Sequence, residues 1–487
     1  MKSGVHTKNG VTGPTAHSPA RRAVLVQALA GAGALSLAPA NALSAPRLVV
    51  ANVSGLYSVE VARIEAPVTA EQVSALIETW PGKVAVGGAR YSMGGQIALT
   101  GGLHLDMRSL NKLIWIRPRE KLLRVQAGMR WRELQDILDP LNLSVKTMQS
   151  YANFTVGGSV AVNAHGRYVG HGPISHTVRA LQLVLADGTA VEASRGENSE
   201  LFRAAIGGYG AVGVITEVEL ELAENIRIER IVAEVSIQTY VEHFEREVLA
   251  DQNSVLHNAD LLPPHFDTAV SVTWRKTAKP LTEAARLVAR GQRYGLEQNA
   301  IWVMTEMPGG RRLRKSVAQP LFARKPIVKW LNREASLDAA ELEPRTRRVS
   351  TYALQEYFVP KRNFLRFARA MVDTLRLRDV EALNVSVRHS PVDQTSVLAW
   401  AREESFSFVL YYKQRTHAAA RDAVGRWTRE LIDIALANEG RYYLPYQLHA
   451  TRAQFEQAYP GIAELRSIKR ATDPSAKLSN ELWAKYL

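Results

Sequence analysis

VGGARYSMGG, residues 86–95, follows a short apolar run and places four glycines around an arginine, a tyrosine and a serine. Glycines at this density let the chain turn tightly and bring bare backbone N–H groups close to an anion. A pyrophosphate is a common ligand of such a turn. Because a glycine-rich turn can also be only a turn, this stretch alone leaves the ligand open.

A second glycine cluster, FTVGGSVAVNAHGRYVGHGP, occupies residues 154–173. It sets Gly157-Gly158-Ser159 before a small apolar stretch and then continues with Asn163-Ala164-His165-Gly166. Small side chains along this path would let the backbone lie against a flat ring system. Two such clusters in one region are hard to explain as two unrelated turns.

A third cluster, GYGAVG at 208–213, matches the dinucleotide-binding fingerprint G-x-G-x-x-G letter for letter. The fingerprint requires the order strand, loop, helix, with the pyrophosphate at the start of the helix. Here a helix-like stretch, NSELFRAAIG, comes before the glycines, and the strand-like VITEVELEL comes after them. The order is reversed, and we reject a Rossmann site.

Short strands and helices alternate irregularly over residues 60–225, which favours an α+β fold over a doubly wound sheet. Thr69 and Gln72 form a capping box at the start of one expected helix, and Asp187-Gly188 is the tight turn of an expected hairpin. The expected elements are a helix over 67–80, a strand over 83–88, a strand over 122–128, a helix from 131 that stops near Pro140, and the hairpin over 180–194.

Taken together, the three clusters resemble the FAD-binding domain of the vanillyl-alcohol oxidase superfamily, also called the PCMH-type fold. The resemblance covers roughly residues 55–225 and implies FAD as the cofactor and no metal site. It implies that the segments contact the cofactor in three places: Gly87, Gly88, Ala89, Arg90, Tyr91 and Ser92 at the pyrophosphate; Gly157, Gly158, Ser159, Asn163, His165 and Gly166 along the flavin; and Ile215 at the nucleotide part.

Within that superfamily the chain is similar to the sugar-1,4-lactone and alditol oxidases, D-arabinono-1,4-lactone oxidases among them. QEYFVPKRNFLRF (355–367) is similar to a motif at the start of a cap strand, and NVSVRH (384–389) resembles a cap strand that ends in an active-site arginine, Arg388. YYLPYQLH (442–449) and the last fifteen residues resemble a C-terminal return to the FAD domain. The resemblance therefore implies a two-part PCMH-type FAD-binding domain (55–225 and 441–487) with an α+β cap, or substrate, domain (226–440).

Three departures from the family pattern affect the cofactor and the substrate. Tyr91 stands where many members carry a histidine that bonds covalently to the flavin, so we expect non-covalent FAD. Ser386 replaces a glutamate two residues before the arginine, and Gln447 replaces a lysine two residues before the terminal histidine. The last two changes alter the polar groups that would orient a substrate hydroxyl.

The resemblance implies oxidation of a CH–OH group of a sugar, aldonolactone or polyol by hydride transfer to flavin N5. Arg388 would hold the substrate oxygen, or would pair with a carboxylate such as Glu356. His449 would relay a proton or act as a plain hydrogen-bonding residue, and Tyr91 would donate to substrate or pack on the flavin. The residues do not distinguish between oxygen, a quinone and a cytochrome as the electron acceptor.

Two other functions stay open. GRYVGHGPIS (166–175) is similar to a segment of the cytokinin dehydrogenases, which would imply amine oxidation and an acidic base over the flavin. A non-catalytic secreted or membrane-docked binding protein is the alternative of another class. The three flavin segments argue against it.

The chain has 487 residues, no cysteine and a formal net charge of +14. The missing cysteines exclude disulfides, thiolate metal sites and a cysteine nucleophile. The basic stretch RRLRKSVAQPLFARKPIVKWLNR (311–333) has eight basic residues and no acid, which suits either a solvated loop or peripheral membrane contact. We expect a small-molecule substrate and an electron acceptor as partners, and no nucleic acid.

Residues 1–45 have the pattern of an export signal. Arg21-Arg22 precedes a weakly apolar run over 23–40, and Ala40-Asn41-Ala42 has the form that a signal peptidase accepts. Paired arginines before such a run indicate the twin-arginine route, which carries folded proteins. We therefore expect a periplasmic or secreted protein.

Overall fold

The structure, a computed structural model, describes residues 47–294, 326–344 and 346–487. All of these belong to one compact unit, Arg47–Leu487. The expected export signal over 1–45 lies outside the described residues, and so do residues 311–325 of the basic stretch.

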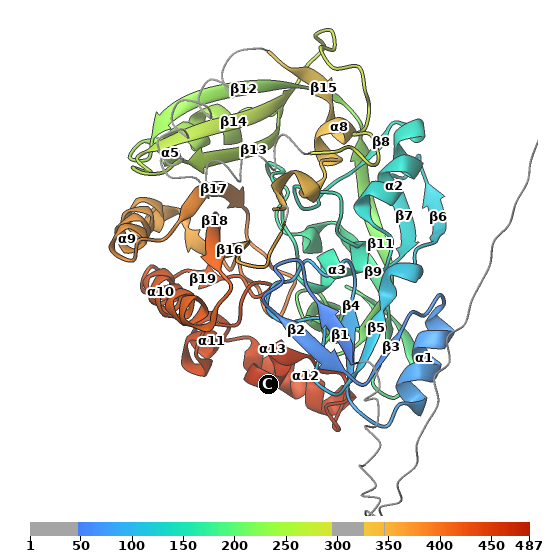
Figure 1. The fold of residues 1–487 in the computed structure, drawn as a ribbon. Helices are drawn as coiled ribbons and strands as arrows, with labels where there is room; N and C mark the ends of the chain where they lie inside the picture. The colour runs from blue at the N-terminus through green and yellow to red at the C-terminus, as the bar shows by residue number, and fades with distance from the viewer. Residues whose placement is uncertain (1–46, 295–325, 345) are drawn as a thin grey trace, which may run out of the picture. The chain divides into compact units, whose positions relative to one another are not determined.

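The described residues from 48 to 224 form three sheets (Figure 1). One is an antiparallel pair, one is a parallel three-stranded sheet and one is an antiparallel six-stranded sheet. In spatial order they contain β1 (Leu48–Ala51) and β2 (Ser58–Val61); β3 (Arg63–Glu65), β5 (Leu103–Asp106) and β4 (Val84–Gly87); and β10 (Ala190–Ser194), β9 (Val178–Val184), β11 (Val214–Glu224), β7 (Leu122–Gln126) and β6 (Leu113–Arg117), with β8 (Leu143–Val145) paired to β11.

Local sequence signals account for several of these elements. Helix α1 (Ala70–Thr79) begins at Thr69, whose hydroxyl accepts a hydrogen bond from the backbone N–H of Gln72, as expected; the Gln72 side chain, however, accepts from the Val68 N–H instead of the Thr69 N–H, so only half of the capping box forms. Helix α2 (Trp131–Leu138) ends just before Pro140. The β9–β10 hairpin turns at Gly188, where φ is +86°. These elements confirm the expectations from the sequence.

The third glycine cluster lies between helix α4 (Ser199–Ala205) and strand β11. The order is helix, loop, strand, which confirms that the fingerprint match is accidental. Gly207 and Gly210 both have positive φ, at +72° and +74°, so the loop needs residues without a side chain.

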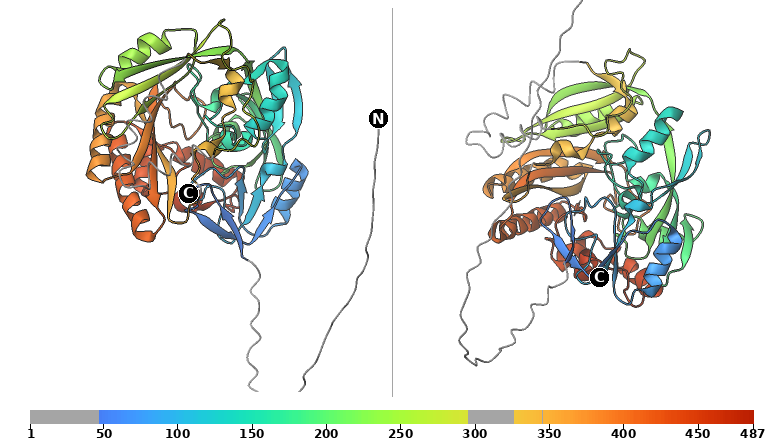
Figure 2. Two further views of the ribbon diagram at one scale, coloured as in Figure 1. Left: turned by 45° about the horizontal axis from the view of Figure 1, so that its top comes forward. Right: turned by 45° about the vertical axis from the view of Figure 1, so that its right-hand side comes forward.

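The second half of the described chain builds one eight-stranded antiparallel sheet. Helices α9 (Phe364–Leu377) and α10 (Ala418–Ala437) cover one face of it, and the segment 47–224 lies on the other side (Figures 1 and 2). This mixture of helices and sheets confirms the α+β class. The strands, in spatial order, are β15 (Val328–Trp330), β12 (Arg227–Ser236), β14 (Thr268–Lys276), β13 (Ser254–Leu261), β17 (Ala382–Ser390), β18 (Ser405–Arg415), β16 (Ser350–Pro360) and β19 (Arg441–Tyr442).

The end of the chain returns to the segment 47–224. It does so through α11 (Arg452–Ala458), α12 (Ile462–Thr472) and α13 (Glu481–Tyr486). The Asn480 amide donates to the Tyr209 carbonyl at 2.9 Å, and the Trp483 indole donates to the Gly208 carbonyl at 3.1 Å. The C-terminal segment thus holds the third glycine cluster in place.

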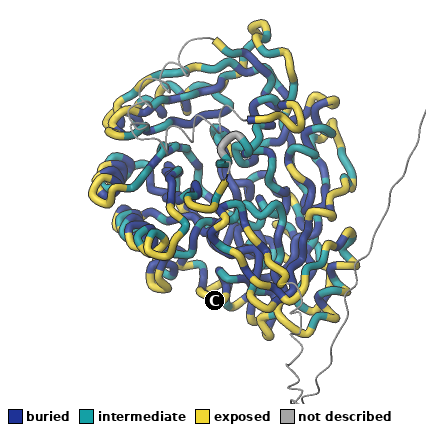
Figure 3. Tube along the Cα trace, viewed as in Figure 1, coloured by how far each residue is buried: buried dark blue, intermediate teal, exposed yellow. Residues whose placement is uncertain are grey.

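The interior consists mainly of the central strands, which are the most buried parts of the trace, while the outward surfaces of the helices are exposed (Figure 3). The main apolar core runs from β7, β9 and β11 into β16, β17 and β18 without a break. The two halves of the described chain therefore share one core, and residues on both sides of it are held in fixed relation.

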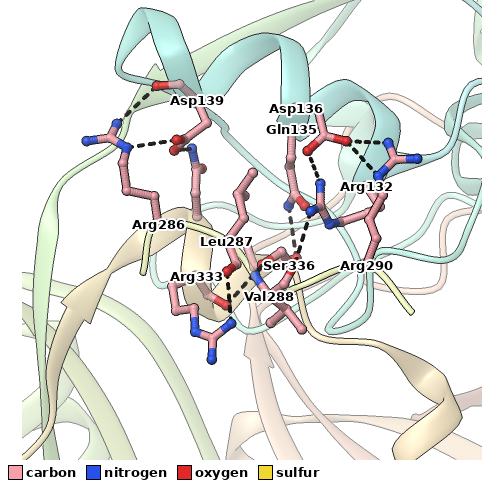
Figure 4. Close-up of polar contacts among 12 residues, drawn as sticks. Arg132, Gln135, Asp136, Asp139, Arg286, Leu287, Val288, Arg290, Arg333 and Ser336 are labelled. Atoms are coloured by element: carbon pink, nitrogen blue, oxygen red, sulfur yellow. Dashed lines mark hydrogen bonds and ion pairs between the residues drawn. The ribbon is translucent and has the colours of Figure 1, made fainter. Parts of the chain in front are cut away.

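A cluster of polar contacts joins α2 to the segment 286–290 and to helix α8 (Leu331–Ala335) (Figure 4). Asp139, only 11% exposed, accepts from Arg286 Nε at 2.7 Å and from the amides of Asn225 and Asn332 at 2.9 Å each. Asp136, 37% exposed, instead pairs with arginines at the surface, Arg132 and Arg290.

This difference in burial predicts different effects on stability. Asp139→Ala leaves three donors without their acceptor, two of them buried amides, and should destabilise the protein by about 3 kcal/mol. Asp136→Ala breaks only surface pairs and should cost less than about 1 kcal/mol. Thermal unfolding of the two variants, followed by circular dichroism, measures the difference. Equal unfolding midpoints for the two variants would show that burial does not determine how much each aspartate contributes to stability.

Candidate active site

The loop that follows β4 forms a concave array of backbone donors. The backbone N–H groups of residues 88–92 make no hydrogen bond to any residue that the structure describes. Arg90 has φ at +65°, the left-handed value that alternates with ordinary values in anion-binding nests. Its side chain is held by Asp106 at 2.9 Å. The geometry fits the pyrophosphate-binding role expected for this stretch.

Glycines of the second cluster allow the backbone of α3 (Val156–Ala161) to approach β7 closely. A Cβ at Gly157 would lie 2.5 Å from the Cβ of Ala127, and one at Gly158 would lie 2.7 Å from the Thr155 hydroxyl oxygen. The Gly157 N–H also donates to the Ala127 carbonyl at 2.8 Å. The close approach leaves a narrow cleft of about 80 Å³ with a mainly apolar lining, which includes Ile215 and Gly210 of the third cluster.

The cleft opens into a larger cavity of about 600 Å³. The two share Gly88, Ser92, Thr155 and Gly158 in their linings, so they form one continuous space. This volume is within the usual range of cofactor and ligand sites. The glycine loops line one side of the large cavity and the eight-stranded sheet lines the other.

Tyr91 contributes an aromatic wall where the two sides meet. Its ring lies 4.7 Å from that of Phe154, centroid to centroid, and both residues line the cavity. Burial, together with the carboxylates of Glu343 and Asp338, raises the pKa of Tyr91 to about 12. The phenol therefore stays neutral at ordinary pH and can only pack or exchange a hydrogen bond.

One row of residues across four neighbouring strands lies on the floor of the cavity. Asp260 on β13 faces Ser386 on β17, Ser386 faces Val409 on β18, and Val409 faces Glu356 on β16. All four line the cavity. The row is three strand spacings long, so the Cα atoms of its two carboxylates are roughly 14 Å apart.

Glu356 is fully engaged by its neighbours. One carboxylate oxygen lies 2.6 Å from His165 Nε2 and the other accepts from the Tyr446 hydroxyl at 3.1 Å. Burial would raise the pKa of Glu356, but its contact with His165, together with Arg388 and Tyr446, holds it below its ordinary value. Glu356 is thus an ionised acceptor that links the second glycine cluster to the sheet.

Asp260 has weaker, neutral donors, and Arg388 has no side-chain partner among the described residues. Asp260 accepts from the amides of Asn384 and Asn258 at 3.2 Å each, and burial raises its pKa although Ser386, Arg388 and Arg167 act in the opposite direction. No hydrogen bond or ion pair joins the Arg388 side chain to any described residue, and its Nε is buried without a partner. The alternative considered from the sequence, an ion pair of Arg388 with Glu356, is therefore wrong, because His165 and Tyr446 hold that carboxylate.

The structure brings most of the expected site residues to this continuous space. Those that line the cleft or the cavity are Gly88, Ala89, Arg90, Tyr91, Ser92, Gly157, Gly158, His165, Ile215 and Arg388. Those that line neither are Gly87, Ser159, Asn163, Gly166 and His449.

The residues outside the linings have packing roles instead. Ser159 is buried beneath α3, where its hydroxyl accepts from the Trp131 indole at 2.8 Å. The Asn163 amide donates to Asp393 at 2.7 Å. A Cβ at Gly166 would lie 2.0 Å from the Met148 carbonyl, and one at Gly87 would lie 2.5 Å from the His104 ring. These residues shape the site from behind and do not line it.

His449 likewise does not line the cavity, which corrects its expected role as a proton relay. Its ring lies beside α10, 3.2 Å from where a Cβ at Gly425 would be. Burial, followed by the charges of Lys485 and Arg429, lowers the pKa of His449 to about 4. Nearby Gln447 is also buried, and its amide donates to the Tyr412 hydroxyl at 2.8 Å.

The sequence alone does not predict Asp260 and Tyr446 as site residues, and it gives Glu356 only a secondary role. Polar residues at alternate positions of an otherwise apolar strand, Asn258 and Asp260 on β13, were the available signal. That alternation shows a shared face, but the strand's neighbours in the sheet decide which cavity the face borders.

Comparison with known proteins agrees with this geometry. The family model described as an FAD binding domain matches residues 61–194. L-gulonolactone oxidase of Bos taurus is 23% identical over 440 residues, which cover 84% of this chain and 90% of that protein. Mitochondrial L-galactono-1,4-lactone dehydrogenase of Brassica oleracea is 29% identical over 47% of this chain and 38% of its own. Alditol oxidase of a Streptomyces species is 31% identical over 36% and 41%.

The protein therefore contains a PCMH-type FAD-binding domain, and FAD is its cofactor. The relatives that it matches are named as oxidases and dehydrogenases. The residues present fit the cofactor, since the nest at 88–92 offers donors to a pyrophosphate and the glycine-lined cleft admits a flat ring system.

The close approach at Gly157 predicts a specific defect in FAD binding. Gly157→Ala should displace α3 from β7 and lower the affinity for FAD at least tenfold, measured by titrating apoprotein with FAD. Ala127→Gly removes the facing methyl group, so the double variant should recover part of the loss. Gly196→Ala, where an added Cβ meets nothing within 4 Å, is the matched control. An unchanged FAD affinity in Gly157→Ala would refute this account of the cleft.

Proposed function

We propose that this protein oxidises a CH–OH carbon of a sugar, aldonolactone or polyol. The observation that carries the proposal is the polar floor of the large cavity, which lies opposite the glycine loops that fit the cofactor. On this floor the Arg388 side chain has no partner among the described residues. The relatives named for gulonolactone, galactonolactone and alditol oxidation support the substrate class. Bound FAD would supply the hydride acceptor, its N5 atom.

The chain's own residues supply the polar steps. Arg388 donates to the oxygen of the carbon that is oxidised, where charge develops as the hydroxyl proton leaves. His165 takes that proton at Nδ1, while its Nε2 donates to Glu356 and so fixes the tautomer. Tyr446 holds the other oxygen of Glu356, and the apolar wall around Tyr91 and Phe154 limits the access of water.

Amine oxidation is the runner-up. The sequence argument against it was the lack of an acidic base, and the cavity contains Asp260, whose pKa is raised by burial. The names of the relatives favour sugar lactones and alditols over amines, so we keep amines as a second arm of the substrate screen.

We also propose export through the twin-arginine route, which would place the protein in the periplasm or outside the cell. This rests on the sequence of residues 1–45 alone. Peripheral membrane contact through the basic stretch 311–333 is a further proposal. In its described part, Lys329 pairs with Glu334 and Arg333 donates to the Leu287 carbonyl, so these two charges are already used within the fold. Within the described ranges no helix is both long enough and apolar enough to span a bilayer.

Anaerobic reduction tests the proposed reaction. The holoprotein is mixed in turn with xylitol, L-gulono-1,4-lactone and an allylic amine. Xylitol or the lactone should bleach the visible flavin band. Arg388→Met should slow this reduction about 100-fold, since one donor to the developing charge is lost. His449→Gln, outside the cavity, should change the rate by less than about twofold, within the ordinary effect of a remote substitution.

Bleaching by the amine alone would favour the runner-up, and no bleaching by any probe would leave a flavin-binding protein without this activity. Reoxidation of the reduced protein with oxygen, a quinone or a cytochrome then identifies the acceptor class.

Tyr91 leads to a separate prediction about the cofactor linkage. A phenol in place of the expected histidine offers no histidyl bond to the flavin, so FAD should be held by contacts alone. Acid precipitation of the yellow holoprotein should leave FAD in the supernatant and a colourless pellet. Yellow protein in the pellet after washing would overturn the prediction.

A further inference from the structure

The two carboxylates at the ends of the cavity floor have different surroundings. Glu356 is closed off by His165 and Tyr446, each on a different carboxylate oxygen. Asp260 also has a donor on each oxygen, but these are neutral amides at 3.2 Å, with the Ser386 hydroxyl as a further neutral donor. Asp260 is half-buried whereas Glu356 is fully buried, so Asp260 is the carboxylate of the floor whose remaining lone pairs a ligand can reach.

Arg388 lies on the same face of the sheet, one diagonal step from Asp260. Asp260 faces Ser386 in the register, and Arg388 follows Ser386 by two residues on the same strand. Such diagonal neighbours are about 7–8 Å apart, too far for direct contact unless a long side chain reaches across. No ion pair joins the two groups, although the charge of Arg388 does influence Asp260.

A carboxylate and a guanidinium thus flank Ser386 without touching one another. A neutral hydroxyl group suits this space, because its oxygen accepts from the guanidinium and its hydrogen is donated to the carboxylate. A carboxylate ligand would satisfy Arg388 but would be repelled by Asp260. The nearby Arg167 does not change the balance, since it is paired with Glu334 at 2.6 Å.

We propose that Asp260, together with Arg388, binds hydroxyl groups of the substrate and makes the site selective for neutral polyols and lactones over the corresponding sugar-acid anions. The inference rests on the proposed function and deepens it by naming the charge class of the substrate. Asn258, Asn384 and Ser386 complete a polar wall that can exchange hydrogen bonds with further hydroxyls. The wall thus recognises a polyhydroxylated molecule without net charge.

Position 386 gives this arrangement a structural reason. The family pattern that the chain resembles has a glutamate at this position. The chain has Ser386 instead, whose side chain is too short to reach far into the cavity. Its facing residue on the neighbouring strand is Asp260. The carboxylate next to Arg388 on the floor therefore comes from β13 instead of β17.

The test compares Asp260→Asn with the wild-type holoprotein, using L-gulono-1,4-lactone as the neutral probe and L-gulonate as the anion. Binding is measured from the change that each probe causes in the flavin spectrum, and the limiting rate from anaerobic reduction by the lactone. In Asp260→Asn the dissociation constant of the lactone should rise at least tenfold and that of gulonate should fall at least fivefold. The limiting rate should change less than threefold, because Asp260 acts in binding.

Three further variants keep the result interpretable. Asp267→Asn, an exposed carboxylate before β14, should behave as wild type. Asp260→Glu keeps the charge and should still exclude gulonate. If Asp260→Asn does not retain FAD, Asp260→Ser takes its place with the same expected shifts.

The outcomes separate the inference from the function on which it rests. If wild type is reduced by the lactone but the preference between lactone and gulonate is the same in Asp260→Asn, the inference is wrong and the proposed function stands. If neither the lactone nor xylitol reduces wild type, the proposed function fails and the inference fails with it.

Discussion

The structure depends above all on the close approach of backbone segments that only glycine permits. The Gly157 N–H bonds the Ala127 carbonyl, and the space for a Cβ at that position is already filled by the Ala127 side chain. Residues 88–92 bend through a left-handed Arg90 that leaves their N–H groups without partners in the described chain. These constraints create a cleft for a flat, phosphate-bearing cofactor, and the sheet, the cavity and the C-terminal return are arranged around it.

Charge is distributed unevenly over the floor of the cavity, and the distribution separates two tasks. At one end, His165 and Tyr446 each hold one oxygen of Glu356, so that group holds the two halves of the protein in register and fixes the imidazole. At the other end, Asp260 and Arg388 keep hydrogen-bonding capacity, which a rigid sheet holds in place. Buried polar groups that are not fully satisfied are costly, so their presence in a cavity is an indication of ligand binding.

Sequence reasoning succeeded where the signal was local. The N-cap at Thr69, the stop at Pro140 and the turn at Gly188 each depend on neighbours within a few residues, and each is found in the structure. The order helix, loop, strand around the third cluster was predicted correctly for the same reason. The cavity linings were predicted in part: Tyr91, His165 and Arg388 line the large cavity, whereas Asn163 and His449 have polar or packing partners elsewhere. Glycine and polar residues that support a site resemble those that line it, and only the direction of the side chain separates them.

The sequence by itself indicated FAD, because its three glycine clusters, in one order, resemble those of a known FAD-binding domain. It also determined that Tyr91 stands where a covalent histidine was expected. Only the tertiary structure decided which carboxylate accompanies Arg388. Asp260 and Arg388 are far apart in the chain, and the pairing of β13 with β17 that brings them to one face depends on the register of a sheet, which no local pattern encodes.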